Sequence, residues 1–158
     1  METTVKKILF VCTGNTCRSP MTEGMLKKAA EEKGLSDRIS VSSAGISVFR
    51  APSASPEAVE VMRRAGIDIS SHRPRQVTAE MLLEADLVIT MTESHRSRIL
   101  DMYPEIKGKV YTIKKFAKME NGSPDIPDPF GGAEKEYKRI ASEIGEAVKK
   151  IIDRLSEG

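Results

Sequence analysis

The chain has 158 residues, 30% of them charged, with a formal net charge of only +2, which fits one domain over residues 1–158 and argues against a nucleic-acid-binding protein. The N-terminus is polar and the apolar runs are short, so we expect neither a secretory signal nor a membrane span. Two cysteines close together exclude a disulfide-rich secreted scaffold, and we therefore expect a cytoplasmic protein with reduced thiols.

The first part of the chain is predicted to form a strand, a loop and a helix. Residues 6–11 contain a continuous apolar run, which is typical of a strand buried on both faces of a parallel sheet. The helix that follows is expected to begin with Ser19 as its N-cap and Pro20 at its first position. Gly34 is expected to end this helix.

The rest of the chain continues the alternation of strands and helices. The remaining predicted elements are a strand at 39–43, helices at 55–66 and 78–85, a strand at 87–91, a helix beginning at Thr92, a strand at 109–113, a polar loop at 118–132 and a final helix. The final helix has an apolar stripe formed by Tyr137, Ile140, Ile144, Ala147, Val148, Ile151, Ile152 and Leu155. This order predicts an α/β fold, with helices on both faces of a parallel sheet.

Two loops are expected at the same edge of that sheet. In open parallel sheets, ligands bind beyond the carboxyl ends of the strands. The loop at 12–19 follows the first strand and the loop at 118–132 follows the fourth, so both reach this edge. Long loops in compact domains are more often functional than not.

The loop after the first strand has the composition of a phosphate site. It consists of Cys12, Thr13, Gly14, Asn15, Thr16, Cys17, Arg18 and Ser19. The helix N-terminus offers unpaired N–H groups and the positive end of a dipole, and Gly14 and Asn15 tolerate the backbone angles that turn further N–H groups inward. Arg18 adds a planar fork that matches two oxygens of a phosphoryl group.

Cys12 would lie at the base of this loop. The positive surroundings should lower its pKa well below ~8.5, so that a thiolate faces the phosphorus as a nucleophile. The Ser19 hydroxyl can donate a hydrogen bond to that thiolate. The alternative, a buried structural cysteine beside an ordinary cap, is disfavoured by an arginine six residues after Cys12.

Val11–Pro20 resembles the loop of the low-molecular-weight protein tyrosine phosphatases, with cysteine, five residues, arginine and serine or threonine. The resemblance extends over the whole chain and implies a three-layer flavodoxin-like fold, with a four-stranded sheet in the order 2-1-3-4. It implies that Cys12 is the nucleophile and that Arg18 binds phosphate and stabilises the transition state. Further phosphate- or substrate-binding residues would be Thr13, Gly14, Asn15, Thr16, Cys17 and Ser19, supported by Ser43 and His72. The partners would be phosphorylated proteins, with phosphate as product, and we expect a monomer without cofactor or metal.

The resemblance also points to a general acid in the loop at 118–132. The family acid is the aspartate of an Asp-Pro-aromatic motif, which here is Asp128, with Phe130 as a wall of the entrance. Asp128 would protonate the leaving group and then activate water. Asp125 is interpreted as a solvated or supporting residue. His95, like His72, is interpreted as structural or superficial rather than catalytic.

Thr16 bears on the choice of substrate. The tyrosine phosphatases of this family usually carry a bulky aliphatic residue here, whereas the bacterial protein arginine phosphatases carry threonine. A smaller side chain with a hydroxyl suits the polar guanidinium of phosphoarginine, and one such contact is worth ~1–3 kcal/mol. The sequence therefore favours a protein arginine phosphatase, with a tyrosine phosphatase as the alternative. Phe130 does not discriminate, because an aromatic ring stacks on either group.

Other classes fit less well. A thiol-coupled arsenate reductase would need a further cysteine after Cys17, and none exists. No cluster with metal-ligand spacing supports a metal phosphatase. A non-catalytic phosphate-binding module is a remote alternative, because Cys12, Arg18 and Asp128 are all present. In the family, the pair Cys12 and Cys17 can form a reversible disulfide that protects the nucleophile, although Cys17 could equally be a small packed side chain.

Overall fold

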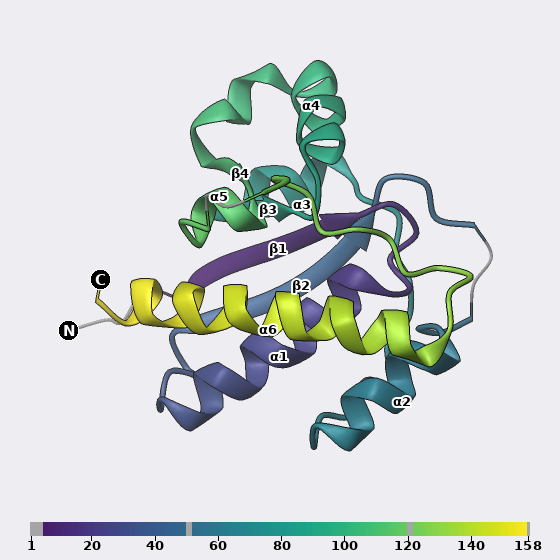
Figure 1. The fold of residues 1–158 in the computed structure, drawn as a ribbon. Helices are drawn as coiled ribbons and strands as arrows, with labels where there is room; N and C mark the ends of the chain where they lie inside the picture. Colours follow the sequence, from purple (N-terminus) through teal and green to yellow (C-terminus); the bar gives the residue numbers. More distant parts are fainter. Residues whose placement is uncertain (1–4, 50–51, 120–121, 158) are drawn as a thin grey trace.

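A parallel four-stranded sheet forms the centre of the computed structural model, which describes residues 5–49, 52–119 and 122–157. The strands lie in the order β2-β1-β3-β4 (Figure 1). Their bounds are Lys6–Cys12 for β1, Ile39–Gly45 for β2, Leu87–Thr90 for β3 and Val110–Thr112 for β4. The predicted flavodoxin-like order 2-1-3-4 is thereby confirmed.

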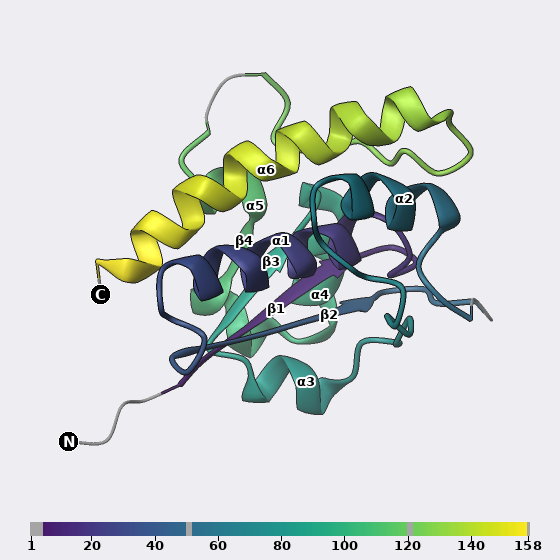
Figure 2. The same cartoon turned by 90° about the horizontal axis from the view of Figure 1, so that it is seen from below.

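Helices cover both faces of this sheet (Figure 2). On one face lie α1 (Arg18–Glu32), α2 (Pro56–Arg64) and the long α6 (Glu134–Ser156), and on the other lie α3 (Ala79–Glu84), α4 (Glu93–Met102) and the 3-10 helix η1 (Pro104–Lys109). A short helix that the sequence pattern did not predict, α5 (Ile113–Phe116), follows β4. In the described ranges, no helix is long and apolar enough to cross a membrane.

The alternating side chains of β1 join two separate cores. Ile8, Phe10 and Cys12 pack into the cluster beneath α1 and α6. Leu9 and Val11 pack into the cluster on the α3 and α4 side. Each face is apolar because a central strand of a parallel sheet is covered on both sides. Cys12 is the last residue of β1 and is buried on the α1 side, at the carboxyl edge of the sheet.

Several helix ends match the sequence expectations, but the start of α1 does not. Ser55, Thr78 and Thr92 each accept a backbone N–H as N-caps. The expectation of Ser19 as N-cap is wrong, because α1 begins at Arg18 and has no side-chain cap. The Ser19 hydroxyl is instead engaged with Cys12 on the inner side of the loop.

The strand bounds shift slightly from those expected. The second strand continues beyond residue 43 to Gly45, because Gly45 is the parallel partner of Cys12. β3 and β4 are shorter than expected. The apolar stripe of α6 is buried as predicted, with only Leu155 partly exposed.

Candidate active site

A cavity of about 360 Å³ opens at the carboxyl edge of the sheet. It is lined by Cys12, Thr13, Gly14, Thr16, Cys17, Arg18, Ser47, Phe49, Asp128 and Phe130. The loop after β1 forms its floor, and the loop before α6 reaches it from the far end of the chain. The structure therefore brings together the two loops that the strand order predicts at one edge.

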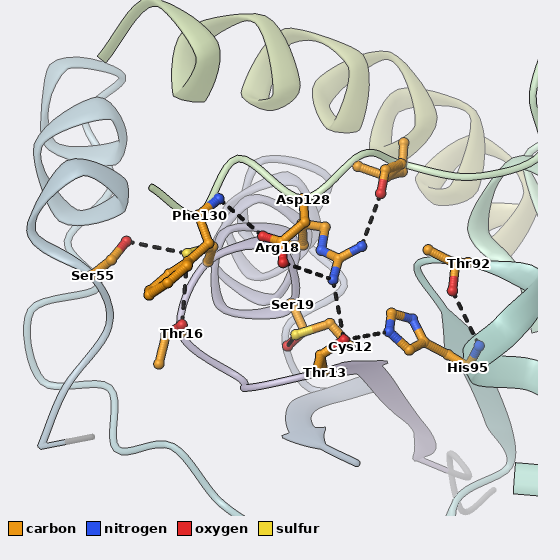
Figure 3. Close-up of polar contacts among 12 residues, drawn as sticks. Cys12, Thr13, Thr16, Arg18, Ser19, Ser55, Thr92, His95, Asp128 and Phe130 are labelled. Atoms are coloured by element: carbon orange, nitrogen blue, oxygen red, sulfur yellow. Dashed lines mark hydrogen bonds and ion pairs between the residues drawn. The ribbon is translucent and has the colours of Figure 1, made fainter. Parts of the chain in front are cut away.

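The Cys12 thiol is held by a directed hydrogen bond. Its Sγ lies 2.8 Å from the Ser19 Oγ, and the side-chain amide of Asn15 donates to the same Ser19 Oγ at 2.9 Å. Because that hydroxyl already accepts from Asn15, its own hydrogen is free to point at the Cys12 sulfur. Figure 3 shows Cys12 and Ser19 side by side beneath Arg18.

Asn15 holds the shape of the loop. Its φ of 58° is in the left-handed region, which asparagine tolerates better than most residues. Its side-chain NH2 group donates to Ser43 Oγ at 3.0 Å, and its backbone carbonyl oxygen lies 2.9 Å from His72 Nε2. Its side-chain oxygen accepts the Arg75 N–H at 2.9 Å. Ser43 and His72 thus contact Asn15, where the resemblance places them.

The acidity of Cys12 departs from the sequence expectation. Burial raises the pKa of the Cys12 thiol, and this effect outweighs the lowering by the Ser19 hydroxyl, the Arg18 charge and the N–H groups of Ser19 and Asn15. The expectation of a lowered pKa is therefore wrong. It counted the positive groups of the loop but not the depth at which β1 ends.

Arg18 spans the two loops. It is 5% exposed, and its Nη1 donates to the Ile126 carbonyl at 3.0 Å. Its Nη2 donates to Thr13 Oγ1 at 3.4 Å and lies 3.7 Å from Asp128 Oδ2. The guanidinium is therefore fixed between the floor of the cavity and the Asp128 carboxylate (Figure 3).

Asp128 stands on a loop that is tied to the sheet and to α4. The Ile126 N–H donates to the Met91 carbonyl, just after β3. Asp125, interpreted as solvated or supporting, accepts the Glu93 N–H at 2.8 Å at the start of α4. Asp128 accepts the N–H of Phe130 at 3.0 Å, and its side chain is half-exposed at the cavity mouth.

Two aromatic side chains flank the opening. Phe130 is 74% exposed and Phe49 is 83% exposed. Phe49 and Ser47 were missed in the sequence analysis. The available signal was their position directly after the second strand, at the edge where the other two loops meet. Thr16 lines the same cavity from the loop floor.

The second cysteine, Cys17, lines the same cavity and contacts two hydroxyl groups. Cys17 Sγ lies 3.4 Å from both the Ser55 hydroxyl and the Tyr137 hydroxyl. Cys12 and Cys17 are both free thiols. The reversible disulfide implied by the resemblance stays a prediction.

His95 is also nearer the site than its interpretation suggested. It is buried in the first turn of α4, and its Nε2 lies 2.8 Å from Thr13 Oγ1. Burial, together with the charges of Arg18 and Arg98, lowers the pKa of His95 to about 4. Its sequence context offered no signal, since the contact joins residues 82 positions apart.

Comparisons with known proteins agree with this geometry. A protein-arginine-phosphatase of Bacillus subtilis is 39% identical over 95% of this chain and 97% of its own length. A probable low molecular weight protein-tyrosine-phosphatase, EpsP of Ralstonia nicotianae, is 37% identical over 96% of this chain and 97% of its own. A solved YwlE arginine phosphatase, a mutant with a phosphorylated active-site serine, superposes with a TM-score of 0.88 at 36% identity, covering 95% of each chain.

The sequence model of the low molecular weight phosphotyrosine protein phosphatases matches residues 7–158. This match includes both loops of the cavity, β1 from its second residue onward, and the whole of β2, β3 and β4. The chain therefore belongs to the low-molecular-weight phosphotyrosine protein phosphatase family and is a cysteine-dependent protein phosphatase.

Proposed function

We propose that this protein is a protein arginine phosphatase, which hydrolyses phosphoarginine in proteins through a cysteinyl-phosphate intermediate. The Cys12 thiolate attacks phosphorus and forms an S–P bond, while the bond from phosphorus to the guanidine nitrogen breaks. Asp128 gives its proton to that nitrogen. In the second step Asp128 takes a proton from water, the resulting hydroxide attacks phosphorus, and phosphate leaves as the Cys12 thiolate is restored.

The contacts of the cavity support these roles. Arg18 is held by Ile126 on one side and by Thr13 on the other, so its fork keeps one orientation toward the phosphoryl oxygens. The hydrogen bond from Ser19 lowers the cost of the Cys12 thiolate in both steps. The phosphorylated serine in the active site of the YwlE mutant supports a covalent intermediate at this position.

Thr16 carries the assignment of the substrate. It lines the cavity, and its Oγ1 lies 3.6 Å from Cys17 Sγ. A short side chain with a hydroxyl leaves room and a polar contact for a planar guanidinium, whose faces Phe49 and Phe130 can stack against. The protein-arginine-phosphatases of Bacillus subtilis and Geobacillus stearothermophilus, at 39% and 40% identity, support the same substrate.

Phosphotyrosine is the second candidate. The exposed rings of Phe49 and Phe130 at the mouth would equally hold a phenol ring by aromatic stacking. The family likeness to EpsP favours this candidate as well. The two substrates place different groups beside Thr16, which allows a direct test.

The experiment compares kcat/KM for phosphoarginine and phosphotyrosine peptides of the same sequence, in the wild type and in Thr16→Ile. We expect the wild type to prefer phosphoarginine, and Thr16→Ile to shift the ratio toward phosphotyrosine by one to two orders of magnitude. Cys12→Ser serves as the inactive control. A wild type that clearly prefers phosphotyrosine would contradict the arginine assignment, and one without activity on either peptide would favour a non-catalytic module.

We further propose that the chain acts as one domain and as a monomer in the cytoplasm, without a cofactor. The reaction requires a reduced Cys12, and both cysteines are free. Every group of the proposed mechanism comes from this one chain. Cytoplasmic conditions keep such thiols reduced.

A further inference from the structure

His95 lies far from residues 12–19 in the sequence, but its side chain contacts this segment, which we call the phosphate loop. It points from the first turn of α4 toward Thr13, and its Nε2 lies 2.8 Å from Thr13 Oγ1 (Figure 3). The Thr92 hydroxyl accepts the His95 N–H at 3.1 Å and fixes the start of the helix. His95 is 4% exposed, so its ring is held in place.

The second ring nitrogen decides which way the hydrogen bond runs. His95 Nδ1 is buried and, among the residues that the structure describes, has no hydrogen-bond partner. A buried N–H without an acceptor is rarer and costlier than a bare acceptor nitrogen. The low pKa of His95, about 4, leaves the ring one hydrogen at neutral pH. That hydrogen is therefore on Nε2, which donates to Thr13.

With this direction of the hydrogen bond, the hydroxyl hydrogen of Thr13 is not used in its contact with His95. Its oxygen accepts from His95 Nε2 at 2.8 Å and from Arg18 Nη2 at 3.4 Å. A hydroxyl has two acceptor positions and one donor, so both acceptor positions are filled. Within the described ranges, the Thr13 hydroxyl makes no other hydrogen bond. Thr13 lines the cavity next to Cys12.

We propose that His95 is a positioning residue, which directs the hydroxyl hydrogen of Thr13 into the cavity as a donor to the bound phosphoryl group. This inference rests on the proposed function of the site. Thr13 would add a side-chain donor to the N–H groups of the loop and the fork of Arg18. Were the His95 hydrogen on Nδ1, Thr13 would donate to the histidine and offer nothing to phosphate.

The test measures binding of inorganic phosphate by isothermal titration calorimetry at pH 7, which requires no turnover. Thr13→Val, which keeps the shape of the side chain but removes the hydroxyl, should weaken binding about tenfold. Thr13→Ser should keep the wild-type affinity. His95→Leu should weaken binding by a similar factor, and His95→Gln, whose amide can donate from nearly the same place, should recover most of it.

Combining the changes tests whether the two residues act as one unit. The double variant Thr13→Val with His95→Leu should bind phosphate no more weakly than Thr13→Val alone, because the histidine acts only through the hydroxyl. Ser97→Ala, on the exposed side of α4, is the matched control and should bind like the wild type. Thermal melting curves show whether each variant is folded. If His95→Leu does not fold, the Thr13 variants alone test whether the Thr13 hydroxyl donates to phosphate.

The outcomes separate this inference from the proposed function. Wild type that binds phosphate and hydrolyses phosphopeptides, together with a Thr13→Val variant of unchanged affinity, would overturn the role of Thr13 and leave the phosphatase standing. Additive losses in the double variant would overturn the action of His95 through Thr13. Wild type that neither binds phosphate nor turns over either peptide would overturn the proposed function itself.

Discussion

Cys12 Sγ and Ser19 Oγ lie 2.8 Å apart, in a contact whose direction is set by a third residue. Asn15 donates to the same serine oxygen, which leaves the Ser19 hydrogen for the sulfur. The Cys12 thiol thereby has a hydrogen-bond donor although it is buried. Its reactivity depends on the balance between burial, which raises the pKa of Cys12, and this hydrogen bond, which lowers it.

Ser19→Ala should make the Cys12 thiol still less acidic. Removing the hydrogen bond from Ser19, the largest of the contributions that lower the pKa of Cys12, raises this pKa further. The rate of alkylation by iodoacetamide as a function of pH measures this directly. The midpoint should move to higher pH, while Ser94→Ala, an exposed control, leaves it in place. An unchanged midpoint would contradict the assigned hydrogen bond.

Asp128→Asn should reduce turnover without loss of phosphate binding. The amide cannot give a proton to the leaving group, so kcat should fall by about two to four orders of magnitude on phosphopeptides. Aryl phosphates with acidic phenols need no proton and should lose much less. A series of aryl phosphates of increasing phenol pKa gives the measurement. Equal losses across the series would argue against Asp128 as the acid.

Gly45→Ala should distort the loop that follows β1, because the added Cβ would clash with its backbone. A Cβ at this position would lie 2.6 Å from the Thr13 carbonyl oxygen and 3.0 Å from the Asn15 nitrogen. Both are backbone atoms of the phosphate loop, so relief requires the loop to move. We expect lower thermal stability and weaker phosphate binding. Gly108→Ala, where an added Cβ meets nothing within 4 Å, is the control and should change neither.

Stability should fall on acidification because of His95. Its pKa is lowered from 6.5 to about 4 in the folded chain, so between these values the unfolded chain binds more protons. The stability contributed by the neutral ring is complete above pH 6.5 and is lost as pH falls through about 4. Urea unfolding at pH 7 and pH 4 should show His95→Gln losing less stability than the wild type, by up to about 3 kcal/mol. Equal losses would show that His95 titrates normally.

The chemistry of the phosphate loop could be predicted because it is local. Cys12, Asn15 and Arg18 lie within one short segment between a strand and a helix, and their spacing alone indicates a phosphate site. Asp128 could be placed only through the family resemblance and the strand order. Asp-Pro by itself is typical of many turns.

Other features could not be predicted, because they arise from packing between distant segments. His95 reaches Thr13 across 82 positions, and Phe49 meets the mouth only once β2 lies beside β1. The acidity of Cys12 was predicted in the wrong direction for the same reason. Charged residues can be read from the sequence, whereas the burial of Cys12, which raises its pKa, depends on how the whole core packs.

The bond from Arg18 to the Ile126 carbonyl joins positions 108 residues apart. During synthesis the N-terminal segment emerges first, and domains fold as their last contacts become available. A ribosome-bound chain can therefore hold the cysteine and arginine long before it holds the aspartate. A chain that ends before Ile126 lacks both the carbonyl that holds Arg18 and the Asp128 carboxylate beside it, so the cavity can be complete only when nearly the whole chain has been synthesised.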